Sequence, residues 1–157
     1  QGWRPISDIG QGQFFDRVTN SVPKDAGNPY LLERYFEKGL VSGCMGTKHT
    51  DEVKKRYAAL GYGQQDLTSK ATRLDPNGYC PTLRAGTAKD KGSYQAVRPI
   101  HYKSPRVITP REAARLQGFP DWFVFHRTKW HSFRQIGNSV SPIVSEAILN
   151  VIYQKLI

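Results

Sequence analysis

Side chains able to carry out chemistry occur at a few separate places in this sequence. A cysteine thiolate is a common nucleophile, and the two cysteines are Cys44, within Gly-Cys-Met-Gly, and Cys80, which a proline follows. His126 and His131 are five residues apart, but no cluster of Cys or carboxylate side chains surrounds them, so a metal site is disfavoured. Residues 137–140, Gly-Asn-Ser-Val, are more informative, because a turn of this composition brings backbone N–H groups and short polar side chains close to a ligand.

The segment 106–142 contains the elements that must position these polar residues. Thr109 and Glu112 have the spacing of a capping box, which predicts that a helix begins here, and Gly118 is typical of a helix end. Residues 135–142 are predicted to form a glycine-containing turn that leads into a second helix. The short polar residues are therefore expected between two helices.

The last helix is expected to begin at Pro142, with Ser141 as its cap. Its apolar residues recur at helical spacing along one face: Val144, Ala147, Ile148, Val151, Ile152 and Leu156. Burying a large side chain of this kind contributes about 1.5–3 kcal/mol. The helix must therefore pack on this domain or on a partner.

Two segments of this region resemble sequence motifs of DNA (cytosine-5) methyltransferases. Residues 106–121, RVITPREAARLQGFPD, resemble the ninth motif of that family, and residues 135–140, QIGNSV, resemble the tenth. Two long motifs in the family's order make a specific signal, whereas GNSV alone would be weak.

The resemblance implies roles for residues of both motifs. Arg111 would fasten a DNA-recognition lobe, and the implied structural residues are Thr109, Arg111, Glu112 and Gly137. The implied cofactor-binding residues are Asn138, Ser139 and Val140, which would complete the methionine-end wall of an S-adenosylmethionine site.

Positive charge is concentrated in one part of the chain. The formal net charge is +10, and residues 84–134 carry 11 Lys and Arg against 3 Asp and Glu. Such a block fits contacts with DNA phosphates, which supply most of the non-specific affinity of DNA-binding proteins. A solvated charged face is the alternative, but beside the two motifs double-stranded DNA is the favoured partner.

The middle of the chain lies where the resembled family keeps its variable target-recognition segment. Residues 81–86, Pro-Thr-Leu-Arg-Ala-Gly, are similar to a Thr-Leu element near the end of that segment, although an ordinary strand end is the alternative. Arg84 and Arg98 are candidates for contacts with guanine edges. The predicted DNA-binding residues are Thr82, Leu83, Arg84, Lys89, Lys91 and Arg98.

The catalytic motifs of the resembled family are absent from this sequence. Methyl transfer to cytosine C5 needs a thiolate that attacks C6, from a Pro-Cys motif, and an acid near N3, from a Glu-Asn-Val motif. It also needs a cofactor pocket built on a Gly-rich turn, and the target base must leave the helix stack. Neither Cys44 nor Cys80 follows a proline, and Glu-Asn-Val, a strand followed by G-x-G and the upstream Gln-x-Arg-x-Arg element are all missing. We expect no catalytic residue here and no methylation by this polypeptide alone.

The expected fold class is α+β, a small mixed lobe of short strands and helices. Helices are predicted at 29–38 and at 52–60, the latter capped by Thr50 or Asp51, and strands at 67–74, 79–83 and 94–100, with a turn at 75–78. Residues 1–125 are predicted to form a target-recognition domain that includes the ninth motif. Residues 126–157 are assigned to the catalytic lobe, with the C-terminal amphipathic helix packed on its Rossmann-like core.

The sequence is interpreted as the C-terminal, target-recognising part of an S-adenosylmethionine-dependent DNA cytosine-5 methyltransferase of a restriction–modification system. The catalytic lobe is expected either on a separate subunit or on a segment absent from this polypeptide, whose first residue is Gln1 and not methionine. A stand-alone basic DNA- or RNA-binding module is the alternative, but it explains neither the apolar last helix nor GNSV. Two cysteines without a disulfide framework, and no apolar run of the roughly 18–20 residues that span a bilayer, favour a cytoplasmic protein without a membrane partner.

Overall fold

The computed structural model describes residues 2–5, 16, 18, 28–84 and 98–157. Its elements, in chain order, are β1 (Arg4–Pro5), α2 (Pro29–Phe36), β2 (Leu40–Val41), α3 (Asp51–Ala58), α4 (Pro110–Leu116), α5 (Lys129–Asn138) and α6 (Pro142–Leu156). The two short strands pair antiparallel, with Arg4 opposite Val41. The mixed α+β class is confirmed, and its strand content is small.

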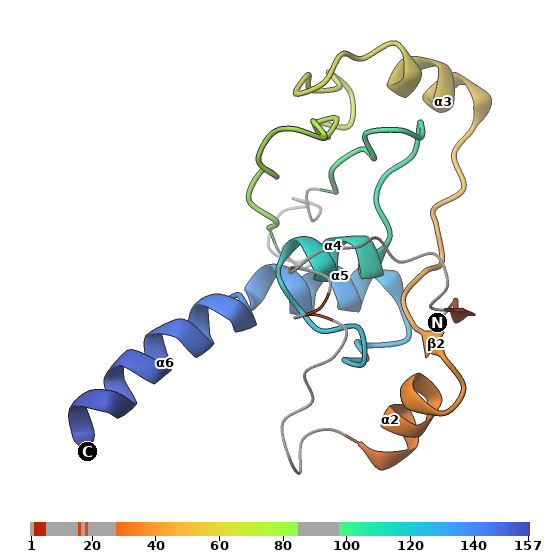
Figure 1. Cartoon of the computed structure of the whole chain (residues 1–157). Coiled ribbons are helices and arrows are strands. Elements are labelled where there is room, and N and C mark those ends of the chain that lie inside the picture. The colour runs from red at the N-terminus through yellow and green to blue at the C-terminus, as the bar shows by residue number, and fades with distance from the viewer. Residues whose placement is uncertain (1, 6–15, 17, 19–27, 85–97) are drawn as a thin grey trace, which may run out of the picture.

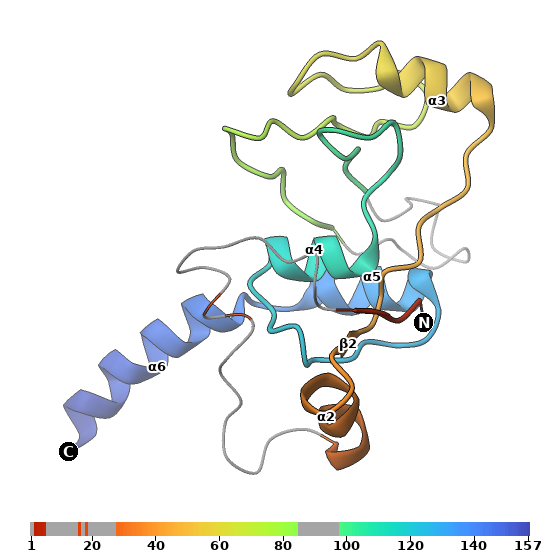
Figure 2. The same cartoon turned by 45° about the vertical axis from the view of Figure 1, so that its right-hand side comes forward.

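Two helices lie side by side at the centre of the molecule, and the other elements surround them (Figure 1). α4 and α5 form this pair, while α3 and the loops that follow it make up a separate upper lobe. α2 lies on the opposite side of the pair, beside the short sheet. α6 extends away from all of these elements, as the turned view in Figure 2 also shows.

The main hydrophobic core lies between α4 and α5. Its buried residues are Ile108, Ala113, Ala114, Phe119, Phe125, Phe133 and Ile136, with Leu74 and Leu83 packed against them. The two alanines of α4 leave room for the rings and branched side chains from α5 and from the 119–125 loop. The two segments that resemble sequence motifs therefore share one core.

The upper lobe has its own smaller core. Tyr57 of α3 packs with Ala71, Ile100 and Val107, and Val53 and Leu60 cover this cluster. Segments 65–73 and 100–107 form no regular strands: one isolated bridge joins residues 73 and 100, and each segment has one further bridge within itself. Side-chain packing thus holds this lobe together more than strand pairing does.

The strands predicted at 67–74 and 79–83 do not form, and of 94–100 only residues 98–100 are described, with isolated bridges from Ile100 to Arg73 and to Val107. A buried carboxylate explains the first of these corrections. Asp66 accepts hydrogen bonds from Ser69 N (2.7 Å), Ser69 Oγ (2.6 Å) and Arg56 Nε (2.6 Å), and Lys70 has φ of +57°. These contacts stabilise a turn in place of an extended chain. Pro81, within the second predicted strand, has no N–H for a ladder.

The predicted helices of the first half are confirmed, with small changes at their ends. α2 begins after Asn28, whose Oδ1 accepts from Tyr30 N at 3.0 Å, and it ends two residues before the predicted position. Thr50, and not Asp51, caps α3, because Thr50 Oγ1 accepts from Val53 N. The turn at 75–78 also forms, with Gly78 N donating to Asp75 O.

Residues 135–138 do not form the predicted turn but the last turn of α5. Phe133 and Ile136 explain this, because both are buried in the core and only helical geometry keeps both side chains on the side that faces α4. Ser139 Oγ then donates to Ile136 O at 2.7 Å, and the helix ends. Gly137 is therefore helical, and the connection to α6 is limited to residues 139–141.

α6 begins at Pro142, as predicted, with Ser141 at the cap position but without a side-chain cap hydrogen bond. None of its residues is buried. Leu149 and Tyr153 are exposed as well as Val144 and Ile148, so apolar side chains reach around most of the helix and not along one face alone. Within the described residues, no helix has the length and apolarity needed to cross a membrane.

Candidate nucleic-acid and cofactor interface

The start of α4 is held by the predicted capping box. Thr109 Oγ1 accepts from Glu112 N at 3.2 Å, and Thr109 N donates to Glu112 Oε2 at 2.7 Å. Arg106 adds two hydrogen bonds to the Glu112 carboxylate, at 2.9 and 2.7 Å. Burial acts to raise the pKa of Glu112, but these hydrogen bonds outweigh burial and hold that pKa below its ordinary value.

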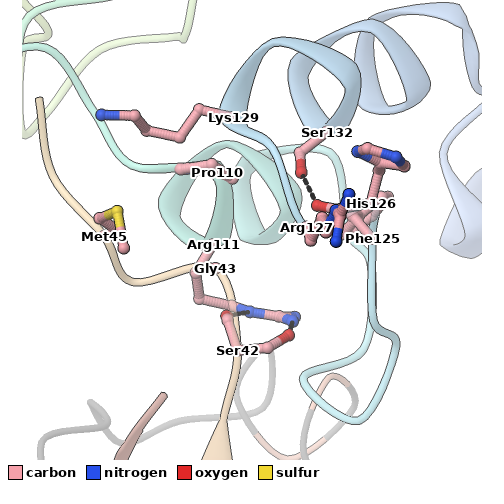
Figure 3. Close-up of a pocket in the computed structure, with 10 residues that line it drawn as sticks. All are labelled: Ser42, Gly43, Met45, Pro110, Arg111, Phe125, His126, Arg127, Lys129 and Ser132. Carbon is pink, nitrogen blue, oxygen red and sulfur yellow. Dashed lines mark hydrogen bonds between the residues drawn. The ribbon is translucent and has the colours of Figure 1, made fainter. Parts of the chain in front are cut away.

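Arg111, in the first turn of α4, joins separate segments of the chain. Its side chain is only 3% exposed. Nε donates to Ser42 O at 2.9 Å, Nη1 to Pro120 O at 3.2 Å, and Nη2 to Phe123 O at 2.7 Å and to Ser42 Oγ at 3.2 Å. Figure 3 shows this side chain pointing from α4 toward Ser42. One planar cation thus connects α4, the loop after β2 and the 119–125 loop.

Asp121 forms the second half of this joint. It is 1% exposed and accepts from Arg115 Nε at 2.9 Å and Arg115 Nη2 at 2.7 Å, while Arg111 Nη1 lies 3.6 Å from its Oδ1. The backbone N–H of Asp121 donates to Val18 O at 2.7 Å. The charge of this buried carboxylate is therefore matched by two arginines of α4.

A small pocket lies beside this joint, between the loop after β2 and the start of α5 (Figure 3). Arg127 and Lys129 are among its lining residues, and Lys129 Nζ donates to Gly46 O at 2.9 Å. Met45 and Arg127 are exposed. No sequence motif indicates this pocket, and the signal that points toward it is the dense positive charge of residues 84–134.

The predicted DNA-binding residues have different surroundings. Thr82 and Arg84 are exposed, whereas Leu83 between them packs against the main core. The Arg98 guanidinium lies over the Phe133 ring, 4.8 Å from its centroid, and its burial lowers the pKa of Arg98. Lys89 and Lys91 lie outside the described residues. The structure thus brings Arg98 onto the core that α5 shares and leaves Arg84 exposed at the surface.

The exposed aromatic and basic residues of the upper lobe were not predicted from the sequence. Tyr79 has a relative exposure of 101% and directly follows the turn at residues 75–78, three residues before Thr82. Tyr62, Lys70 and Lys103 are also exposed on this lobe. Aromatic residues among lysines are a pattern typical of nucleic-acid-binding surfaces.

The predicted cofactor-binding residues lie at the C-terminal end of α5. Asn138 is exposed, Val140 is 67% exposed, and Ser139 is half-buried with its hydroxyl bonded to Ile136 O. Asn138 also lines a shallow depression with His126, His131, Arg134 and Gln135. A carboxamide and an apolar side chain that both reach the surface fit one wall of a site for a ligand with polar and apolar parts.

The two histidines of this depression do not form a metal site of the usual kind. Their ring centroids are 4.5 Å apart, and His126 Nδ1 accepts from Thr128 N at 3.1 Å. Over the residues that the structure describes, no group of three or more His, Cys, Asp or Glu side chains is placed to bind a metal ion.

Comparison with known proteins identifies the class to which this chain belongs. The family model described as C-5 cytosine-specific DNA methylase matches residues 19–154. The chain belongs to this family, which confirms the resemblance of the two motifs.

Individual relatives match only with part of their length. The type II methyltransferase M.XorII of Xanthomonas oryzae pv. oryzae is 49% identical over 125 residues, 80% of this chain and 30% of that protein. M.DsaV of Dactylococcopsis salina is 38% identical over 122 residues, 75% of this chain and 32% of that protein. A crystal structure described as a DNA modification methyltransferase encoded within a prophage (E. coli) has a TM-score of 0.84 and 52% identity, covering 98% of this chain. This chain covers 40% of that structure, so it spans well under half of each of these three relatives.

Proposed function

We propose that this chain supplies the DNA-recognition lobe and one wall of the S-adenosylmethionine pocket in a DNA cytosine-5 methyltransferase of a restriction–modification system. Family membership supports the reaction class, and the type II methyltransferases among its relatives support the biological setting. The chain would act together with a catalytic lobe that carries the nucleophilic cysteine.

The shared core of α4 and α5 is the observation that carries this proposal. α4 belongs to the ninth motif and α5 ends in the tenth, and Ala113, Phe133 and Ile136 pack in one cluster between them. Arg111, at the start of α4, would fasten the recognition lobe through its hydrogen bond to Ser42 O. A cofactor wall and a DNA-reading lobe are thereby held by one rigid unit.

The DNA side of the proposal is the exposed surface of the upper lobe and the segment that follows it. Arg84, Lys70 and Lys103 would neutralise phosphates, and Thr82 would position the backbone. Tyr79, fully exposed on a short turn, is placed to contact bases or sugars. Lys89, Lys91 and Arg98 remain proposed members of this surface.

The cofactor side consists of Asn138, Ser139 and Val140. S-adenosylmethionine would supply the methyl group when bound. Asn138 would provide hydrogen bonds and Val140 an apolar contact, while the Ser139 hydroxyl ends α5 and fixes the direction of its neighbours. Arg111, Thr109, Glu112 and Gly137 would hold this frame without touching the reacting atoms.

α6 is proposed to pack on the catalytic lobe, together with the rest of residues 126–157. Its exposed apolar side chains include Ile148, Val151 and Ile152. A helix that is apolar around most of its circumference is stable when a partner covers it. In this arrangement α6 would anchor the recognition lobe to the part of the enzyme that carries the thiolate.

An assembly assay tests the proposal. The chain is combined with a polypeptide that carries the catalytic lobe of a family member, and transfer of labelled methyl groups to double-stranded DNA is measured. We expect transfer from the mixture and none from either polypeptide alone. No transfer from any combination, with the two polypeptides shown to associate, would contradict the proposal.

Substitutions in the cofactor wall sharpen this test. Replacing Asn138 and Ser139 by leucine is expected to weaken S-adenosylmethionine binding by the assembly at least tenfold, since it removes the polar wall and lost hydrogen bonds of this kind are worth roughly 1 kcal/mol each. Asn77→Leu is the control, because Asn77 is exposed on the distant turn at 75–78. Unchanged cofactor affinity in the double variant would show that the tenth-motif assignment is wrong.

A further inference from the structure

The turn that ends α4 contacts the connection between α5 and α6. Gln117 Nε2 donates to Ser139 O at 3.0 Å, in a partly buried position. The next residue, Gly118, has φ of +81°, and a Cβ placed on it would lie 3.0 Å from both Ser141 Oγ and Ile143 Cδ1. Residues 117–118 therefore touch the beginning and the end of the 139–143 segment.

The opposite end of α4 is fixed to the loop that leads to the upper lobe. Arg111 N donates to Gly43 O at 3.1 Å, and the Arg111 side chain donates to Ser42 O at 2.9 Å. α4 itself is short and lies in the core, where Ala113 and Ala114 are fully buried. It is thus a rigid link between that loop and the 139–143 segment.

We propose that Gln117 is a positioning residue that couples DNA binding by the upper lobe to the geometry of the cofactor wall. Gln117 holds the carbonyl of Ser139, and Asn138 and Val140 are the two residues on either side of it. A displacement of α4 when DNA engages the upper lobe is transmitted through this hydrogen bond to both exposed side chains. Linkage requires that the cofactor then affects DNA affinity by the same factor. This inference rests on the function proposed above.

Gln65 offers a matched control for Gln117. Gln65 Nε2 donates to Lys70 O at 3.0 Å, so it makes the same kind of side-chain-to-backbone bond at the same distance, within the upper lobe. Methionine has nearly the volume of glutamine and lacks the amide donor. Gln117→Met and Gln65→Met thus remove bonds of the same type and length, the first partly buried between α4 and the 139–143 segment and the second exposed within the upper lobe.

The first measurement uses the chain itself. Amide hydrogen exchange of peptides covering residues 139–143 is followed with and without a mixed-sequence DNA duplex at low salt. We expect DNA to slow this exchange in the wild-type chain and in Gln65→Met, and to have no effect on it in Gln117→Met. Exchange that DNA does not change in the wild-type chain would overturn the coupling. Failure of the chain to bind DNA at all would overturn the proposed function and this inference with it.

The second measurement uses the assembly with a catalytic lobe. Loss of the Gln117 bond is expected to raise the KM for S-adenosylmethionine roughly three- to tenfold, with kcat changed less than twofold. Gln117→Lys, which restores a donor, is expected to recover part of this loss. Gln65→Met is expected to leave the cofactor KM unchanged. Equal effects of Gln117→Met and Gln65→Met, or an equal fall in kcat without a change in KM, would show a merely structural role and overturn the proposal.

Discussion

At the scale of a residue, Arg111 shows how a buried charge is stabilised in this protein. All three of its guanidinium nitrogens donate hydrogen bonds, to acceptors on Ser42, Pro120 and Phe123. Lysine could not replace it, because a single ammonium cannot reach acceptors on three segments at once. The residue is therefore specified by the directions of its donors as much as by its charge.

Removing this cation is expected to destabilise the chain strongly. Arg111→Met keeps the aliphatic stem but leaves buried carbonyls without donors and Asp121 with one arginine fewer, so the free energy of unfolding should fall by about 3–5 kcal/mol. The control is Arg127→Met, which removes an exposed arginine that lines the neighbouring pocket. Urea unfolding of both variants checks this, and a loss below about 1 kcal/mol for Arg111→Met would contradict the role of the joint.

Protonation of two histidines is expected to make the stability of the folded chain depend on pH. His49 Nε2 accepts from Val107 N at 3.3 Å, and His101 Nδ1 accepts from Lys103 N and Ser104 N at 3.1 Å, so each ring must be neutral at these atoms. Burial lowers the pKa of both histidines, and nearby positive charges act in the same direction. At His101, Glu112 opposes this lowering of the pKa, while Arg106 and Lys103 add to it.

Because both folded-state pKa values lie below 6.5, the unfolded chain binds protons first as pH falls. Stability is then fully present above about pH 6.5 and decreases below it. His49→Gln with His101→Asn keeps an acceptor at each position and should remove most of the change between pH 7.5 and 5.5. Thermal unfolding at the two pH values checks this, and a wild-type midpoint that does not shift would argue against it.

At the scale of the element, the end of α4 depends on a backbone conformation that suits glycine. Gly118 has a positive φ, and the space that a side chain would need is already filled by Ser141 and Ile143. Gly39, after α2, also has a positive φ, of +58°, but nothing lies within 4 Å of its missing Cβ. Comparing substitutions at these two sites therefore separates the free-energy cost of the positive-φ backbone conformation from that of the steric contact.

Gly118→Ala and Gly39→Ala are therefore expected to differ. Each should lose about 1–2 kcal/mol because alanine is strained at positive φ. Gly118→Ala should lose a further ~1 kcal/mol or more, since Ile143 and the 139–143 segment must move. Urea unfolding measures both values. Equal losses would mean that the connection to α6 adapts freely and is not held by α4.

At the scale of the whole molecule, charge and apolar surface lie on different parts of the chain. The basic residues between 84 and 134 carry most of the net charge, whereas α6 holds much of the exposed apolar surface. This separation fits a molecule that binds a polyanion with one part and a protein surface with another. It also predicts that the two interactions respond differently to salt.

DNA affinity of the chain is expected to fall steeply as salt increases, because several lysines and arginines displace counterions from phosphates. Arg84→Gln should reduce the slope of log K against log salt by about one, the effect of losing one phosphate contact. Lys155→Gln, at the end of α6, should leave the slope unchanged. Fluorescence anisotropy with a labelled duplex checks both, and an affinity insensitive to salt would contradict the basic DNA-binding surface.

Features encoded by neighbouring residues were predictable from the sequence alone. Thr109 and Glu112 form their capping box because both partners lie within one helical turn. Family membership was likewise recognisable, since each motif is a continuous run of residues. The absence of Pro-Cys and Glu-Asn-Val could be read directly for the same reason.

Only the tertiary structure decided the features that depend on distant partners. Residues 135–138 became helix because burial of Phe133 and Ile136 against α4 outweighed the turn tendency of Gly and Asn. The buried Asp66 replaced a predicted strand by a turn, and the Arg111 donors found acceptors as far away as Ser42. In each case the outcome depends on contacts between residues far apart in the chain. These contacts contribute free energy only once the chain has folded.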